Sequence, residues 1–236
     1  MTKVFAINGS PRMAEGNTAR ILAPFFEGMK DAGAKIELVY AKRLNINPCI
    51  GDFQCWFKKV GECIYKDDMQ IIYPKLRAAD ILVLATPVYI PLPGEMQNFI
   101  NRLCPIVEPF LEFTKGRTRA RFHEDVKLSK IVLVASSGWW ELGNFGTVIR
   151  IAEELALGAN IEFSGAVLRP HASELQNYPN KAAVVFTAAR QAGHQLVKDG
   201  KMAEQTLQAI SQPLVPEVEL RERYNQEYLK AKNKEA

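Results

Sequence analysis

The loop NGSPRMAEGNT, residues 8–18, concentrates small hydrogen-bonding groups between an apolar stretch and an amphipathic one. It holds two glycines, two asparagines, a serine, an arginine and a threonine. Hydroxyl, amide and backbone N–H donors at the start of a helix bind anions, above all phosphate groups. The loop therefore predicts a phosphate site.

The spacing narrows the kind of phosphate. A triphosphate loop needs a lysine before its Ser or Thr, whereas Gly16 is followed here by Asn17. The dinucleotide pattern G-x-G-x-x-G is missing too, because Gly9 and Gly16 stand seven positions apart. A loop rich in hydroxyl and amide groups at a helix N-terminus, without either of these patterns, suits a terminal monophosphate. The alternative is an ordinary strand-to-helix turn with Asn17 or Thr18 as the helix N-cap.

A second chemically suggestive stretch is PCIGDFQCWFKKVGECIYKDDM, residues 48–69, with Cys49, Cys55 and Cys63. Three of four cysteines in one short segment do not resemble the dispersed framework of a secreted disulfide protein. A structural zinc fits poorly, since no histidine is near and no C-x-x-C pair occurs. In a reducing compartment these thiols either pack as small apolar residues or form a site. We expect Cys104 to be buried.

Strands and helices alternate along the chain and position these motifs. Apolar runs predict strands at 3–8, 34–40, 79–89, 127–138 and 159–168. Helical periodicity predicts helices at 18–32, from Asp67 or Asp68 onward, at 94–104, 147–158 and 182–211, with Asp67 and Asp68 as caps. Such alternation favours an open, mostly parallel sheet whose ligand binds at the carboxyl ends of the strands.

Three motifs together resemble the NAD(P)H-dependent FMN reductase family of flavodoxin-like proteins. They are NGSPR followed by GNT, ATPVYIPLPGEMQNFINRL after the third predicted strand, and ASSGWWELGNFG after the fourth. The resemblance covers roughly residues 1–170. It implies an α/β fold with a five-stranded parallel sheet and helices on both faces. We expect this FMN-binding domain over residues 1–211 and a helical C-terminal extension over 212–236.

The resemblance also implies site residues. Ser10, Arg12, Asn17 and Thr18 would surround the FMN phosphate. Two further groups would enclose the isoalloxazine ring: Pro87, Val88 and Tyr89 on one side, and Ser136, Ser137, Gly138 and Trp139 on the other. Tyr89 could equally be a core aromatic, and Trp139 with Trp140 an interface or core pair.

The cysteine stretch is similar to the segment that holds a four-iron cluster in the related iron–sulfur flavoproteins. Asp52 occupies the second cysteine position of that pattern, and the gap from Cys55 to Cys63 is long. A cubane cluster takes one thiolate per iron, so Asp52 weakens this reading. We expect no metal, with a cluster on Cys49, Cys55 and Cys63 as the alternative.

The implied activity is transfer of a hydride from NAD(P)H to FMN and on to a small acceptor such as a flavin or quinone. This chemistry belongs to the cofactor, and we assign no catalytic residue, His171 included. The alternative is an iron–sulfur flavoprotein or a flavodoxin-like electron-transfer protein reduced by a protein partner. A flavodoxin-like carrier would need an acidic docking face, which the net charge of +4 disfavours.

Composition and charge set the remaining expectations. The net charge is small, and the sequence has no long run of like charges, so we expect no nucleic-acid partner. No apolar run is long enough to span a membrane. We expect a cytoplasmic protein. The basic segment 105–127 predicts a solvated loop, with a cover over the site or a contact to the NADPH phosphate as the alternative. Leu220, Tyr224 and Tyr228 form a narrow apolar stripe that predicts packing on the domain's own flank or on another subunit of a homodimer or homotetramer.

Overall fold

The computed structural model describes residues 1–114 and 116–233. Its centre is a sheet of five parallel strands in the order β2-β1-β3-β6-β7. The strands are β1 (Lys3–Asn8), β2 (Lys35–Tyr40), β3 (Ile81–Pro87), β6 (Lys130–Ser136) and β7 (Glu162–Arg169). This is the flavodoxin-like strand order. The predicted open parallel sheet is confirmed.

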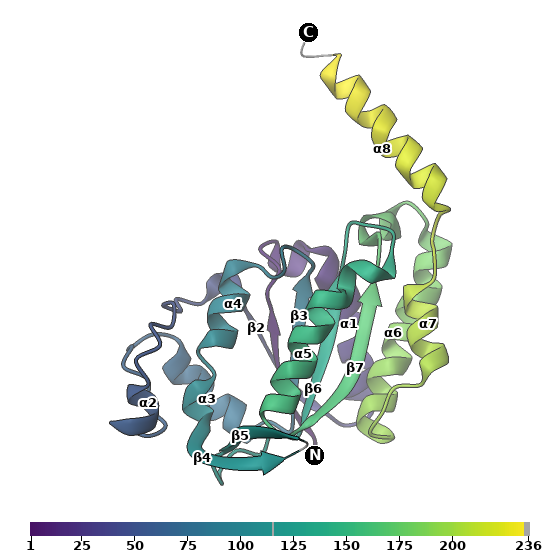
Figure 1. The fold of residues 1–236 in the computed structure, drawn as a ribbon. Coiled ribbons are helices and arrows are strands. Elements are labelled where there is room, and N and C mark those ends of the chain that lie inside the picture. The colour runs from purple at the N-terminus through teal and green to yellow at the C-terminus, as the bar shows by residue number, and fades with distance from the viewer. Residues whose placement is uncertain (115, 234–236) are drawn as a thin grey trace.

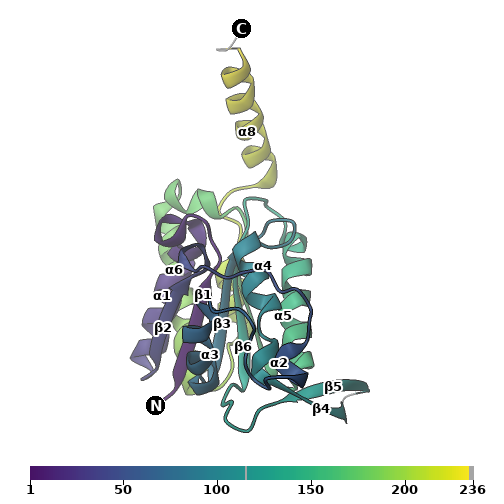
Figure 2. The ribbon, with the colours of Figure 1, turned by 90° about the vertical axis from the view of Figure 1, so that its left-hand side faces the viewer.

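Helices cover both faces of the sheet (Figures 1 and 2). One face is covered by α1 (Asn17–Asp31), α6 (Pro179–Lys198) and α7 (Glu204–Ser211). The other is covered by α3 (Met69–Ala78), α4 (Gly94–Asn101) and α5 (Gly146–Gly158). The short helix α2 (Gln54–Phe57) lies on the outer flank, and α8 (Glu217–Lys232) ends the described chain.

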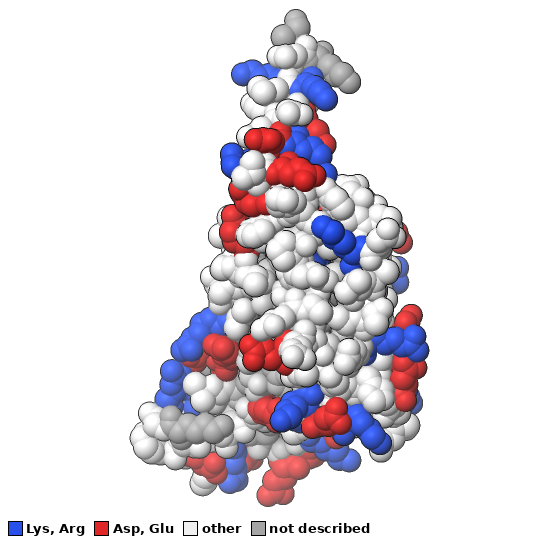
Figure 3. Space-filling view, turned by 90° about the vertical axis from the view of Figure 1, so that its right-hand side faces the viewer, with Lys and Arg blue, Asp and Glu red and all other residues white. Residues whose placement is uncertain are grey.

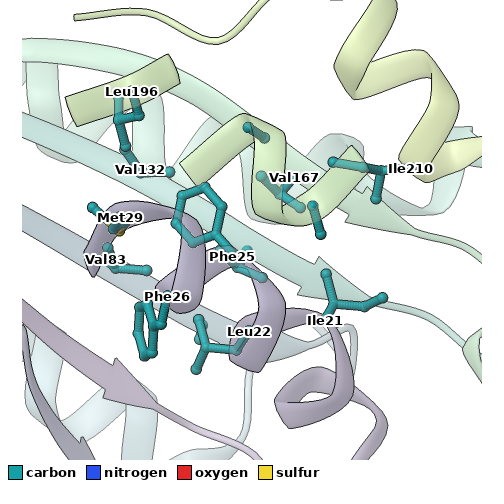
Figure 4. Packing of buried hydrophobic residues seen from close by; sticks show 14 of the residues in the cluster. Ile21, Leu22, Phe25, Phe26, Met29, Val83, Val132, Val167, Leu196 and Ile210 are labelled. Carbon is teal, nitrogen blue, oxygen red and sulfur yellow. The ribbon is translucent and has the colours of Figure 1, made fainter. Parts of the chain in front are cut away.

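The first core joins α1 and α6 to the sheet (Figure 4). Ile21, Leu22, Phe25 and Met29 recur at helical spacing and are almost fully buried. Two glycines allow α1 and α6 to approach closely. A Cβ atom at Gly28 would lie 1.7 Å from the carbonyl oxygen of Arg190. A Cβ at Gly193 would lie 1.9 Å from that of Phe25. Helix α1, which begins at the phosphate-type loop, is therefore rigidly seated.

The basic segment is not a loop but an antiparallel hairpin of β4 (Val107–Thr114) and β5 (Arg117–Phe122). It lies beside the amino ends of the sheet strands, away from the loop at Gly9–Gly16, so the alternative that it covers the site is wrong (Figure 1). Arg117 pairs with Glu154 at 2.7 Å, and Arg121 pairs with Glu108. Lys115, which belongs to the same basic group, lies outside the described residues.

The region predicted as one helix over 182–211 is two helices, α6 and α7. The chain turns between them at Gly200, whose φ of +77° suits glycine. Beyond α7, helix α8 projects from the body of the molecule (Figures 1 and 3). Its base is fixed by an ion pair of 2.5 Å between Arg223 and the buried Glu174.

Of the stripe along α8, only Leu220 is buried, whereas Tyr224 and Tyr228 are exposed. Packing of Tyr228 on the domain's own flank is therefore wrong, and a contact with another subunit stays a prediction. Among the described residues, no helix is long and apolar enough to cross a membrane.

Candidate functional site

The loop after β1 is held in shape by Asn8, the last residue of that strand. Asn8 is fully buried, and its Oδ1 accepts the backbone N–H of Ser10 at 2.9 Å. The backbone N–H of Gly9 donates to the carbonyl of Ala85 at 2.7 Å, which extends the pairing of β1 with β3. The loop is therefore anchored at the centre of the sheet, where strand order reverses between β1 and β3.

Helix α1 begins at Asn17 without a side-chain cap, because Gly16 occupies the N-cap position. The backbone N–H groups of a first helical turn have no partner within the helix. Gly16 also lets the loop pass close to Ser10, since a Cβ there would lie 2.4 Å from the Oγ of Ser10. The buried hydroxyl of Ser10 and the uncapped helix start thus lie side by side, as an anion cradle needs.

Two further loops meet this one at the carboxyl edge of the sheet. The backbone N–H of Val88, just after β3, donates to the carbonyl of Ser136 at 2.8 Å. The hydroxyls of Thr18 and Ser136 share a buried hydrogen bond of 2.8 Å, which joins α1 to the end of β6. Three loops that are distant in sequence are thereby fixed to one another.

All predicted FMN-contacting residues except Trp139 line one cleft formed by these loops. The lining residues are Ser10, Pro11, Arg12, Gly16, Asn17, Thr18, Pro87, Val88, Tyr89, Ser136, Ser137, Gly138 and Ala172. The Trp139 side chain is 71% exposed and borders a separate hollow beside α8. Two hydrogen bonds hold the Trp139 backbone: its N–H donates to the Oγ of Ser137 at 3.0 Å, and its carbonyl accepts the backbone N–H of His171 at 2.7 Å.

His171 is buried and holds the chain between α7 and α8 in place. Its Nε2 accepts the backbone N–H of Leu214 at 3.0 Å, and its ring stacks against Trp140. Burial, with the positive charge of Arg169 adding to it, lowers the pKa of His171 to about 4. Arg169, itself fully buried, donates to the carbonyls of Ile210 and Gln212. His171 is therefore neutral at pH 7, and its contacts are structural.

Asp67 does more than cap a helix. Its carboxylate forms a two-pronged ion pair with Arg102, at 2.8 and 3.1 Å, and both side chains are 1% exposed. It also accepts the backbone N–H of Asn47 at 3.0 Å and that of Met69 at 3.2 Å. Burial alone would raise the pKa of Asp67, but the hydrogen bonds from Arg102 and Asn47 lower it to about 2. Together with the contacts to Asn47, this pair fixes both ends of the cysteine segment to the end of α4.

The cysteine segment forms a cavity of its own, of about 170 Å³, on the flank that carries α2. Cys49, Cys55 and Cys63 line it together with Cys104, which begins the short 3-10 turn Cys104–Ile106 after α4. Cys104 is half-buried, and burial raises the pKa of its thiol to about 12. The cavity and the cleft of the three loops lie at opposite ends of α4.

Sequence reasoning did not single out Asn8, Ala172 or the Asp67–Arg102 pair, and it used Gly16 only for its spacing. Asn8 and Gly16 lie within the quoted motif, so a search for the residues that shape a loop, rather than donate to a ligand, would have found them. Ala172 lines the cleft beside Ser137, whose carbonyl accepts the Ala172 N–H at 2.9 Å. Nothing in the local sequence marks Arg102 as the partner of Asp67.

Comparison with known proteins places the chain. Residues 2–174 match the family model described as NADPH-dependent FMN reductase. An iron-sulfur flavoprotein from Archaeoglobus fulgidus is 34% identical over 104 residues, covering 44% of this chain and 46% of that protein. The chain spans about half the length of the curated relatives it matches.

Two solved structures share the fold. An NAD(P)H:quinone oxidoreductase from Methanothermobacter marburgensis superposes with a TM-score of 0.55 at 15% identity, over 83% of this chain and 96% of that one. An FMN-dependent NADH-azoreductase from Bacillus anthracis, in complex with FMN, superposes with a TM-score of 0.54 at 13% identity, over 85% of this chain and 97% of that one. The family match, the flavodoxin-like strand order and the three-loop cleft agree, and the chain belongs to the NADPH-dependent FMN reductase family.

Proposed function

We propose that the chain binds FMN in the three-loop cleft and catalyses hydride transfer from NAD(P)H through FMN to a small acceptor such as a flavin or quinone. The observation that carries the proposal is the convergence of the β1, β3 and β6 loops at the reversal of strand order. Family membership supports it, as does the FMN complex of the azoreductase that shares this fold.

The phosphate end of FMN fits the cradle beside α1. Ser10 and Thr18 offer hydroxyls, Asn17 an amide and Arg12 a positive charge. The uncapped N–H groups of α1 add donors at the positive end of the helix dipole. The lack of a side chain at Gly16 leaves room, because any Cβ there would collide with Ser10. A dianionic monophosphate is the group that this donor set matches best.

The ring end fits between the other two loops. Pro87, Val88 and Tyr89 give one wall, and Ser136, Ser137 and Gly138 give the other, with backbone groups for the polar edge of the ring. Bound FMN supplies the hydride-accepting chemistry, whereas the protein binds and orients the ring and leaves one face accessible. The exposed indole of Trp139 lies outside this wall, so we assign it no part in holding the ring.

A second candidate is electron transfer with a protein partner, favoured by the iron-sulfur flavoproteins among the relatives. A flavodoxin-like carrier docks through an acidic face. On the face over α6 and α7, acidic and basic side chains are intermixed around an uncharged centre, which gives such a partner no single-signed surface (Figure 3). The family match favours NAD(P)H as the direct donor.

Ligand pairs with and without a phosphate test the cradle. We expect the flavin-free protein to bind FMN more tightly than riboflavin, measured by quenching of flavin fluorescence. Arg12→Ala should weaken FMN binding about 10- to 150-fold, because a hydrogen bond to a charged group contributes about 1.5–3 kcal/mol. It should leave riboflavin binding unchanged. Arg150→Ala, on the exposed side of α5, is the matched control. Equal affinity of the wild-type protein for FMN and riboflavin would refute the assignment.

A further inference from the structure

Helix α8 leaves the body of the molecule with most of its length uncovered (Figures 1 and 2). Every residue from Tyr224 to Asn233 is exposed, and three of them, Tyr224, Tyr228 and Leu229, have large apolar side chains. A helix of 16 residues is only marginally stable in water without packing. Within the described chain, the outer half of α8 therefore presents an apolar surface that nothing covers.

The base of α8 is firmly attached, so the direction of the helix is set. Arg223 pairs with the buried Glu174 at 2.5 Å. The hydroxyl of Tyr178 donates to the carboxylate of Glu219 at 3.0 Å, and Leu220 is buried. The outer half therefore extends from a fixed base, and its surface is preformed.

The hollow beside α8 opens at this base. One wall is the loop 138–141 after β6, and the other is one face of α8, formed by Glu217, Leu220, Arg221, Tyr224 and Asn225. Trp140 is fixed in the loop, because its indole N–H donates to the carbonyl of Val215 at 2.9 Å and its ring stacks on His171. The side chain of Trp139 is largely exposed. The hollow is therefore a preformed aromatic recess at the foot of an uncovered helix.

The face of α8 that borders the hollow continues along the outer half of the helix. Tyr228 lies one turn beyond Tyr224, and Lys232 lies one turn beyond Tyr228, so the three share one side. Glu217 begins this side at the base, where it also pairs with Arg221 at 2.8 Å. Figure 3 shows acidic side chains at the base of α8 and basic ones near its outer end. The two ends of this face therefore carry opposite charges.

Opposite ends meet when two copies of α8 lie antiparallel over their full length. Glu217 of one copy then faces Lys232 of the other, because these residues begin and end the helix. Tyr228 faces position 221 of the other copy, which borders the hollow. A parallel pair would place like charges together at both ends, which is unfavourable. The antiparallel pair makes each contact twice and closes with two subunits. The occupant that fits this face is therefore a second copy of the chain.

We propose that α8 is a dimerisation arm, which pairs antiparallel with α8 of a second copy so that the outer half of each helix covers the hollow of the other. Tyr228 packs into the hollow beside Trp139 of the partner subunit, and two Glu217–Lys232 ion pairs close the ends. Gly138 lines both the hollow and the three-loop cleft, so the partner's helix lies next to the cleft. The proposal does not depend on FMN binding.

Cysteine cross-linking of the full, flavin-free chain tests the pairing and its register. In full antiparallel overlap the two-fold axis passes between positions 224 and 225, so two copies of Asn225→Cys come close enough for a disulfide. Gln226→Cys is the matched control, because Gln226 is also exposed but lies on the opposite face of α8. The wild-type chain reports cross-links through its native cysteines. Under mild oxidation, Asn225→Cys should give about tenfold more covalent dimer than either control on a non-reducing denaturing gel.

Charge exchange tests the ends of the pair. Lys232→Glu and Glu217→Lys each place like charges at both ends of the homodimer. Each change alone should raise the dissociation constant of the dimer, measured by sedimentation equilibrium, about 2- to 30-fold, the effect of losing two exposed ion pairs. A one-to-one mixture of the two variants restores both pairs and should form a mixed dimer with nearly the wild-type dissociation constant. Far-ultraviolet circular dichroism reports whether each variant folds.

Three outcomes would overturn the proposal. The first is a wild-type protein that stays monomeric in sedimentation, including one whose α8 binds a different protein. The second is an Asn225→Cys variant that cross-links no more than Gln226→Cys. The third is a dimer whose dissociation constant is the same in both charge variants as in the wild-type protein. Because all measurements use flavin-free protein, none of these outcomes bears on the flavin function.

Discussion

Replacement of Asp67 by asparagine should destabilise the protein because it leaves the buried Arg102 guanidinium without its counter-charge. Both side chains are 1% exposed. The pKa of Asp67 falls from 3.8 to about 2, since the hydrogen bonds from Arg102 and Asn47 outweigh the opposing effect of burial. This difference corresponds to about 2.4 kcal/mol. Breaking one partner of a buried pair typically costs about 3–5 kcal/mol. We expect a loss of about 3 kcal/mol for Asp67→Asn.

Urea unfolding of the flavin-free protein at pH 7, followed by tryptophan fluorescence, measures this loss. Asp68→Asn is the matched control, because the Asp68 carboxylate accepts one backbone hydrogen bond from Asn45, at 2.7 Å, and has no ion-pair partner in the described chain. It should lose about 1 kcal/mol. The double change Asp67→Leu with Arg102→Met removes the unpaired charge and should recover part of the stability lost in Asp67→Asn.

The pH dependence has a definite sign. The folded pKa of Asp67 lies below its unfolded value, so its contribution is complete above about pH 4 and is lost as the pH falls toward 2. The difference in unfolding free energy between the wild-type protein and Asp67→Asn should therefore decrease over that range. An Asp67→Asn variant no less stable than Asp68→Asn at pH 7 would refute the reasoning.

Three other predictions concern the scaffold. Gly28→Ala should lower the free energy of unfolding in urea by at least about 1–3 kcal/mol, because its Cβ would collide with the backbone of α6. Gly158→Ala is the control and should cost nothing, because a Cβ there would meet open space. Equal effects of the two changes would contradict the close approach of α1 and α6. Burial and the charge of Arg169 lower the pKa of His171 to about 4. The free energy of unfolding of the wild-type protein should therefore fall by up to about 3.4 kcal/mol between pH 6.5 and 4. His171→Gln should not show this decrease. Parallel pH profiles for these two proteins would speak against a buried neutral imidazole. The double change Tyr228→Lys with Leu229→Lys should lower the sedimentation coefficient if exposed α8 joins subunits of a homodimer or homotetramer, and an unchanged coefficient would exclude α8 from the contact.

The centre of the sheet could be predicted because β1, β3 and β6 are buried on both faces and read as continuous apolar runs, whereas the edge strands β2 and β7 are less buried. The hairpin β4–β5 was missed, although Arg117, Arg119 and Arg121 alternate with Thr118, Ala120 and Phe122 as a strand requires. Its net basic character suggested a solvated loop. Pairing with Glu108 and Glu154 explains how these arginines are accommodated instead.

The cleft could be predicted because each of its three loops carries a local motif directly after a strand. The direction of a side chain at a loop end is not encoded in that way, and Trp139 lies outside the cleft for this reason. Contacts between distant segments were also out of reach. The Asp67–Arg102 pair and the approach of Cys104 to the cysteine segment arise only once α3 and α4 pack on the same face of the sheet.

The visible absorption spectrum of anaerobically purified protein, saturated with FMN and recorded before and after addition of NADPH or NADH, tests the central claim most directly. The proposed function predicts two resolved bands of protein-bound flavin that bleach with either nucleotide and return when a quinone or free flavin is added. A protein that takes up no FMN, or whose bound flavin stays oxidised with both nucleotides, would contradict it.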